Sequence, residues 1–197
     1  MSIADEPLFA SLTTARLVLR ELRPTDASAM LVFRGDPLVQ RFNSEPLQSV
    51  EAAAAFIEEL SQGYLGLPAL HWGITLRGQD RVIGLVGLHT WSYHHRRAEV
   101  GYDLAHAFWG QGIGREAVRA VVTFGFTELN LNRIEAATIA DNHESVNLLK
   151  KLGFRLEGIR RGYSWEDDGT FHDSAMFGLL REEFMATTTD KDRIGFS

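Results

Sequence analysis

Apolar and polar side chains alternate along several short runs of this chain, and that period of two is typical of half-buried β-strands. The first run is followed by Pro24, Thr25 and Asp26, which favour a turn and the start of a helix. Two later runs flank Arg77-Gly78-Gln79-Asp80 and predict a hairpin. The pattern predicts strands at Arg16–Leu22, His71–Leu76, Arg81–Thr90, Ala98–Ala105, Arg133–Ala140 and Phe154–Ile159, and a late hairpin of Gly162–Glu166 and Phe171–Leu179 around Asp167-Asp168-Gly169.

Helical spacing of apolar residues separates these strands. The clearest helix is expected over about 113–129, where Ile113, Ala117, Val121 and Phe124 share one face. Ser49 begins an earlier helix that ends at Gln62-Gly63, and a short helix over 142–152 is closed by Gly153. Strand, helix, strand, helix and strand therefore follow one another through the second half of the chain.

Composition narrows the class of protein. With 197 residues, 45% hydrophobic, the chain is expected to form one domain over 1–197, with a core of about 14–184 and a polar, frayed tail at 187–197. The formal charge of -6 disfavours general nucleic-acid binding. The absence of cysteine excludes disulfides, thiolate metal sites and an acyl group held on an enzyme thiol. Met1–Pro7 lacks the features of a leader, and no run could span a membrane, so a cytoplasmic location is expected.

A glycine-rich segment lies between a predicted strand and the helix at 113–129. It reads Trp109-Gly110-Gln111-Gly112-Ile113-Gly114-Arg115-Glu116-Ala117. Glycines allow a tight turn, and the free N–H groups of a first helical turn bind anions, so a phosphate or pyrophosphate is the expected ligand. A plain connecting turn is the alternative. The spacing departs from G-x-G-x-x-G, and no Gly-Lys-Ser/Thr occurs, so dinucleotide and nucleoside-triphosphate loops are disfavoured.

With its flanks, this segment resembles the acetyl-coenzyme A (acetyl-CoA) pyrophosphate loop of the GNAT N-acetyltransferase superfamily. Further motifs occur in the family's order: Thr14–Arg20 with Pro24 and Asp26, Glu99-Val100-Gly101-Tyr102, Leu131-Asn132-Arg133-Ile134, and Asn142-His143-Glu144-Ser145 through Leu152-Gly153-Phe154. Together they are similar to the ribosomal-protein-alanine (Rim-type) branch over about residues 14–184. The resemblance implies a mixed α+β fold, with a mostly antiparallel twisted sheet flanked by helices. It also implies a V-shaped splay between the fourth and fifth strands, near 98–105 and 133–140.

The resemblance implies acetyl-CoA as co-substrate and no metal. Backbone groups around Tyr102 to Leu104 would pair with the pantetheine arm like an added strand, and the amides of the glycine segment would bind the pyrophosphate. The implied cofactor-binding residues are Tyr102, Leu104, Gln111, Gly112, Ile113, Gly114, Arg115 and Asn142.

Direct transfer to a primary amine requires a base for the amine proton and an acid for the thiolate. We expect Glu99 to be the base, because burial on its strand would raise its pKa. The alternative is a structural ion pair of Glu99 with one of the nearby arginines, which are Arg96, Arg97 and Arg133. His89 and Glu166 are alternate bases.

The residue that would protonate the thiolate departs from the usual family pattern. Many superfamily members have a tyrosine in N-x-x-A-x-x-L-Y-x-K-x-G-F, but Leu149 occupies that position here. Ser145 matches a serine proposed to lie near the sulfur in the Rim-type branch, so it is the candidate acid or thiol-orienting group. Its alternative role is a hydrogen bond to its own helix backbone.

The histidines do not predict a metal site. His94 and His95 are adjacent, so a strand would point them to opposite faces. His172-Asp173 could line a pocket or form a structural pair. The expected partner is an amine acceptor, either a protein N-terminus or a small molecule such as an amino acid, polyamine or antibiotic. A non-catalytic acyl-CoA-binding module is the alternative; neither nucleic acid nor membrane is expected, and the chain is a monomer or a homodimer.

Overall fold

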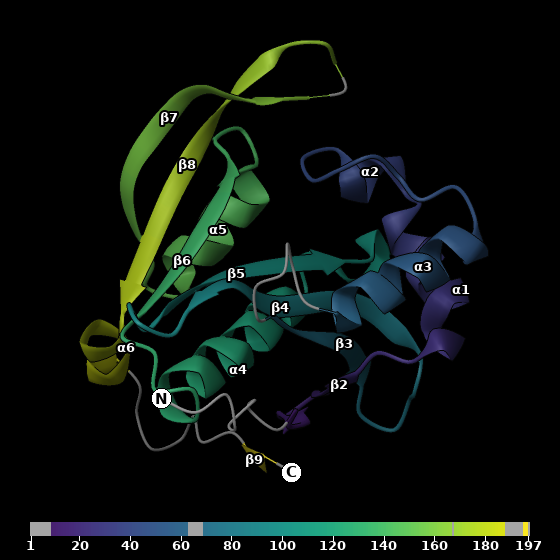
Figure 1. Cartoon of the computed structure of the whole chain (residues 1–197), viewed down its shortest axis with the longest axis horizontal. Coiled ribbons are helices and arrows are strands. Elements are labelled where there is room, and N and C mark those ends of the chain that lie inside the picture. Colours follow the sequence, from purple (N-terminus) through teal and green to yellow (C-terminus); the bar gives the residue numbers. More distant parts are fainter. Residues whose placement is uncertain (1–8, 63–68, 167, 188–194, 197) are drawn as a thin grey trace.

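A computed structural model describes residues 9–62, 69–166, 168–187 and 195–196, which form a mixed sheet with helices on both faces (Figure 1). The strand order is β7-β8-β6-β5-β4-β3-β2-β1-β9. The strands are β1 (Leu12–Thr13), β2 (Leu17–Glu21), β3 (Leu70–Leu76), β4 (Val82–Ser92), β5 (Arg97–Leu104), β6 (Arg133–Ile139), β7 (Arg155–Trp165), β8 (Phe171–Leu180) and β9 (Gly195–Phe196). The helices are α1 (Ala27–Arg34), α2 (Pro37–Gln40), α3 (Val50–Ser61), α4 (Ile113–Thr127), α5 (His143–Lys151) and α6 (Arg181–Thr187), with 3-10 turns η1 (Pro24–Asp26) and η2 (His106–Phe108). The mixed α+β fold expected from the sequence is confirmed.

The ends of the chain differ from the sequence prediction. Gly195–Phe196 pairs with β1 instead of fraying, and the helix α6 was not expected. The late hairpin is longer than predicted, because β7 continues through a register shift between Arg160 and Ser164. Gly162, with φ of 55°, lies within that shift. Met1–Pro7 and Asp167 lie outside the described residues.

Opposite faces of the sheet pack against different helices. Val86 and Leu88 of β4 belong to the larger apolar cluster, which contains the buried side of α4. Leu85 belongs to the smaller cluster with α1 and α3. Because successive residues of a strand point to opposite faces, α4 and the α1–α3 pair cover opposite sides of the sheet. No helix in the described part of the chain is long and apolar enough to cross a membrane.

The sheet divides between β5 and β6. All other neighbouring strands are antiparallel, whereas these two are parallel and pair at only three positions, the last of which is Glu99 with Glu135. Beyond Glu99, β5 continues beside β4 and β6 continues beside β8. The predicted splay is therefore present. Its strands are the fifth and sixth in chain order, because the two-residue β1 was not expected.

A buried ion pair anchors the start of the fold. Arg20 of β2 donates from Nη1 and Nη2 to the two carboxylate oxygens of Asp26, at 2.8 Å each, and from Nε to Asp80 at 2.7 Å. Burial raises the pKa of Asp26, but hydrogen bonds from Arg20 and from the backbone of Arg23 outweigh it and hold that pKa below its usual value.

Candidate active site

The glycine segment forms the start of α4. Gly112 is the N-cap residue in the left-handed region, with φ of 74°, and Glu116 donates the first backbone hydrogen bond of the helix to the Gly112 carbonyl at 3.0 Å. The N–H groups of Ile113, Gly114 and Arg115 precede that bond and lack an acceptor within the helix. Together with the helix dipole, they have the arrangement of an anion-binding helix end, which is the role expected of this segment from the sequence.

A hydrogen-bond network holds this turn against the N-terminal strands. The Glu116 carboxylate accepts from the Thr14 hydroxyl at 2.6 Å, from the Arg16 backbone at 2.9 Å and from Arg16 Nε at 2.6 Å. Arg16 Nη1 donates in turn to the Gln111 carbonyl at 2.9 Å. Burial opposes ionisation of Glu116, but these hydrogen bonds lower its pKa overall, so the carboxylate stays charged. The Thr14–Arg20 motif thus fixes the glycine turn from a distance in sequence.

A cavity of about 340 Å³ opens at the same turn. Its lining residues are Arg16, Gly112, Arg115, Glu116, Arg119 and Lys151. Four cationic side chains and one carboxylate therefore surround the free N–H groups of α4. Positive charge next to such N–H groups suits the pyrophosphate of a nucleotide cofactor.

Gly114 packs closely against α5 and β5 beside the turn. A Cβ on Gly114 would lie 3.3 Å from Leu148 Cδ1 and 3.8 Å from Leu104 Cδ2, so a larger residue would press on α5 and β5. The indole Nε1 of Trp109 donates to the Leu104 carbonyl at 2.7 Å. Of the expected backbone contacts to the pantetheine arm, the one at Leu104 therefore already has a protein partner.

Glu99 lies where β5 and β6 separate, on the face of the sheet that α1 and α3 cover. It is opposite His89 in the β4–β5 register, and His71 packs against the neighbouring Gly87. Burial raises the pKa of Glu99, as does the negative charge of Glu135, while Arg160, the Ala137 N–H and Arg97 act against that rise. The net rise agrees with the expectation for a proton acceptor.

The arginines considered as structural partners of Glu99 bind elsewhere. Arg96 donates to Asn130, Arg97 pairs with Glu135 at 2.8 Å, and Arg133 pairs with Glu135 and Glu157. Each of these arginines thus has another partner, although the positive charges of Arg160 and Arg97 still act on Glu99 and lower its pKa. His89 is also near the splay, and burial lowers its pKa, so it is largely neutral at pH 7.

On the face of the sheet that α4 covers, opposite to that of Glu99, three residues meet at the start of α5. Asn142 is the N-cap residue, and its Oδ1 accepts from the Ser145 backbone at 3.1 Å. The Ser145 hydroxyl lies 2.8 Å from the Tyr102 hydroxyl. Burial raises the pKa of Tyr102 to about 12, with the Ser145 hydrogen bond acting against it.

From the sequence, only a backbone contact is expected of Tyr102, and the pair of hydroxyls is not foreseen. The β4–β5 register could have indicated the side chain's direction, because Tyr102 is opposite Val86 and therefore points to the α4 face. Leu149, at the position of the family's tyrosine, is 1% exposed and packs in the larger core cluster.

His172 and Asp173, expected to line a pocket or to pair with each other, both bind residues of the β7–β8 hairpin. His172 Nε2 is 2.8 Å from Asp168 Oδ2, whereas Asp173 accepts from the Gly162 backbone, so His172 and Asp173 do not pair with each other. Glu166 lies in the turn of the β7–β8 hairpin, which projects beyond the rest of the sheet (Figure 1). Among the described residues, no group of three or more His, Asp or Glu is placed to bind a metal ion.

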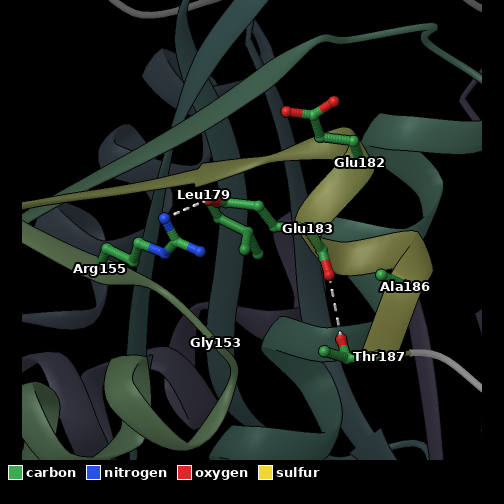
Figure 2. A pocket seen from close by; sticks show the side chains of 7 residues that line it. All are labelled: Gly153, Arg155, Leu179, Glu182, Glu183, Ala186 and Thr187. Carbon is green, nitrogen blue, oxygen red and sulfur yellow. Dashed lines mark hydrogen bonds and ion pairs between the residues drawn. The ribbon is translucent and has the colours of Figure 1, made fainter.

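A larger cavity, about 630 Å³, lies beside α6, and none of its lining residues belongs to the glycine turn (Figure 2). Arg155 and Glu183 in its wall pair at 2.9 Å, and the Thr187 hydroxyl donates to the Glu183 carbonyl. Glu182 points away from both (Figure 2). One cationic residue, Arg155, lines this cavity and is paired with Glu183, whereas four cationic residues line the smaller one, which is therefore the better candidate for the cofactor.

Comparisons with known proteins agree with the geometry. Residues 16–155 match the model of the Acetyltransferase (GNAT) domain family. The chain is 34% identical to the uncharacterized N-acetyltransferase YoaA of Bacillus subtilis over 88% of this chain and 98% of that protein. It is 37% identical to the uncharacterized N-acetyltransferase p20 of Bacillus licheniformis over the same shares. A crystal structure of a putative acetyltransferase superposes with a TM-score of 0.79 at 27% identity, covering 91% of each chain.

The family match covers the glycine turn, the splay and the start of α5, the three features that the geometry brings together. The protein is therefore an acetyl-CoA-dependent N-acetyltransferase, and the chain belongs to the GNAT acetyltransferase family.

Proposed function

We propose that the enzyme transfers the acetyl group directly to the N-terminal amine of a protein, with Glu99 as the base. The observation that carries this proposal is the splay itself. Glu99 lies at its closed end on one face, and the glycine turn and Ser145 lie on the side of the other face. An amine and a thioester that enter from opposite faces would meet beside Glu99.

In this proposal, each residue has a defined task. The amides of the glycine turn and of the first turn of α4, from Gln111 to Arg115, bind the pyrophosphate, and Asn142 and the β5 backbone bind the rest of the cofactor. Glu99 removes a proton from the amine, and its raised pKa makes it a stronger base than an exposed carboxylate. Ser145 orients the sulfur. Because the chain has no cysteine, the acetyl group is not held on an enzyme thiol.

Two relatives bear on the acceptor. The putative ribosomal N-acetyltransferase YdaF of Bacillus subtilis is 28% identical over 90% of this chain and 98% of its own length. The spermidine N(1)-acetyltransferase of Escherichia coli is 33% identical, but over only 52% of this chain. Likeness along nearly the whole chain favours a protein N-terminus, and a polyamine is the second candidate.

The test measures release of free thiol from acetyl-CoA, for which a cysteine-free enzyme contributes no background. The acceptors are N-terminal peptides, the same peptides with a blocked amine, and spermidine. We expect release only with the free peptides. Release with spermidine alone would replace the protein acceptor with a polyamine, and binding of acetyl-CoA without release from any acceptor would favour a non-catalytic module.

A further inference from the structure

The position on α5 that holds a tyrosine in the family pattern holds Leu149 here. Leu149 is 1% exposed and packs among core side chains. Its side chain has no hydroxyl to donate. Another group near the splay must therefore protonate the sulfur, or water must do so.

The side chain of Tyr102 on β5 places a hydroxyl against the start of α5. It lies on β5, three residues beyond Glu99, the last residue of β5 that pairs with β6. Ser145 lies on α5, which follows β6. The 2.8 Å contact between the two hydroxyls therefore joins the two halves of the sheet beyond the point where their strands separate.

The contact is on the side where the cofactor binds. Tyr102 is opposite Val86, whose side chain packs in the α4 cluster, so the phenol is on the α4 face, and Glu99 is on the other. A pantetheine arm held at the glycine turn and extended towards the splay would pass beside this hydroxyl pair. Base and acid would then act on opposite sides of the thioester.

Of the two hydroxyls, the phenol is the better proton donor, because a phenol is far more acidic than an alkyl alcohol. Ser145 is held by its position in the first turn of α5, where its N–H binds the Asn142 side chain. A hydroxyl fixed in this way can accept from the phenol in the free enzyme and donate to the phenolate after proton transfer.

We propose that Tyr102 donates the proton to the departing thiolate and that Ser145 positions its hydroxyl, an assignment that rests on the proposed function. The amine nitrogen forms a bond to the acetyl carbon, and Glu99 takes a proton from that nitrogen. The carbon–sulfur bond breaks with its electron pair on sulfur, and the Tyr102 proton forms the thiol. Water then returns a proton to Tyr102 and removes one from Glu99, so that an amide and free coenzyme A are the only net products.

The test compares Tyr102→Phe with Tyr163→Phe, which removes a hydroxyl from a tyrosine that is 58% exposed on β7. We expect Tyr102→Phe to lower kcat about 100-fold, the lower end of the range for general acid catalysis. The Kd for acetyl-CoA should stay within about threefold, because the pyrophosphate site is unchanged. Tyr163→Phe should leave kcat unchanged.

A second variant separates chemistry from structure. With 3-fluorotyrosine or 3,5-difluorotyrosine at position 102, which keep the ring and the hydroxyl but lower the phenol pKa stepwise from about 12, we expect kcat at a fixed pH near neutrality to change stepwise with the phenol pKa. A structural hydroxyl would show no such dependence. The inference is overturned if Tyr102→Phe keeps kcat within threefold of Tyr163→Phe, or if kcat is the same with either fluorinated residue as with tyrosine. Absence of acceptor-dependent thiol release by the unmodified enzyme would instead refute the proposed function, and the inference with it.

Discussion

Replacing Gly112 by alanine tests whether the left-handed turn is what prepares the cofactor site. The added Cβ would be 3.6 Å from Arg16 Nη2, an ordinary contact, so steric overlap contributes nothing. The cost comes from φ of 74°, which an L-residue adopts at about 1 kcal/mol above the right-handed region. In a protein of this size that cost lowers the Tm by roughly 2–4 °C.

The effect on cofactor binding should be larger. If the alanine backbone relaxes out of the left-handed region, the first N–H groups of α4 turn away from the phosphate. Loss of one charge-assisted hydrogen bond costs about 1.5–3 kcal/mol, which is roughly a 10- to 100-fold increase in Kd. We expect isothermal titration with acetyl-CoA to show an increase in this range.

Gly78→Ala is the matched control. Gly78 has φ of 79° in the β3–β4 turn, and a Cβ there would meet nothing within 4 Å. It should lose a similar amount of stability and keep the wild-type Kd. If Gly112→Ala bound acetyl-CoA within threefold of Gly78→Ala, the role assigned to the helix N-terminus would be refuted.

Three further predictions concern stability and pH. Asp26→Asn should lower the free energy of unfolding in urea by about 3 kcal/mol at pH 7, because it breaks the buried pair with Arg20. The pKa of Asp26 is lower in the folded protein than in the unfolded chain, so the stability that its carboxylate contributes is complete above the unfolded pKa and is lost as the pH falls through the folded pKa. A stability difference between wild type and Asp26→Asn that stays constant across pH would contradict this. Gly87→Ala should lower the free energy of unfolding by about 1–3 kcal/mol, because its Cβ would be 2.8 Å from a backbone carbonyl oxygen of β3. Gly158→Ala is the control, since a Cβ there would meet nothing within 4 Å, and its free energy of unfolding should stay near that of the wild type. Equal losses in the two variants would argue against the packing explanation. The acid limb of kcat/KM should lie above the ordinary glutamate pKa and disappear in Glu99→Gln, and a limb that persists in that variant belongs to another group.

Local patterns in the sequence predicted most elements and the phosphate-binding turn. The helix at 113–129 and the hairpin around Gly78 were predicted because periodicity and turn chemistry depend on residues close together in the chain. The long β7 was predicted as two runs, because its register shift interrupts the alternation. The helix α6 was missed, since it follows β8 directly without a separating turn signal.

The sequence by itself determined the chemistry available to this protein: a glycine turn that can bind phosphate, no cysteine to carry an acyl group, and Glu99 and Ser145 as candidate groups for proton transfer. Only the tertiary structure decided how those groups face one another. The separation of β5 and β6 after Glu99 and the meeting of Tyr102 with Ser145 depend on pairings between distant segments. Strand register sets which face each side chain occupies, and no local pattern specifies that register across a parallel pair of strands joined by a helix.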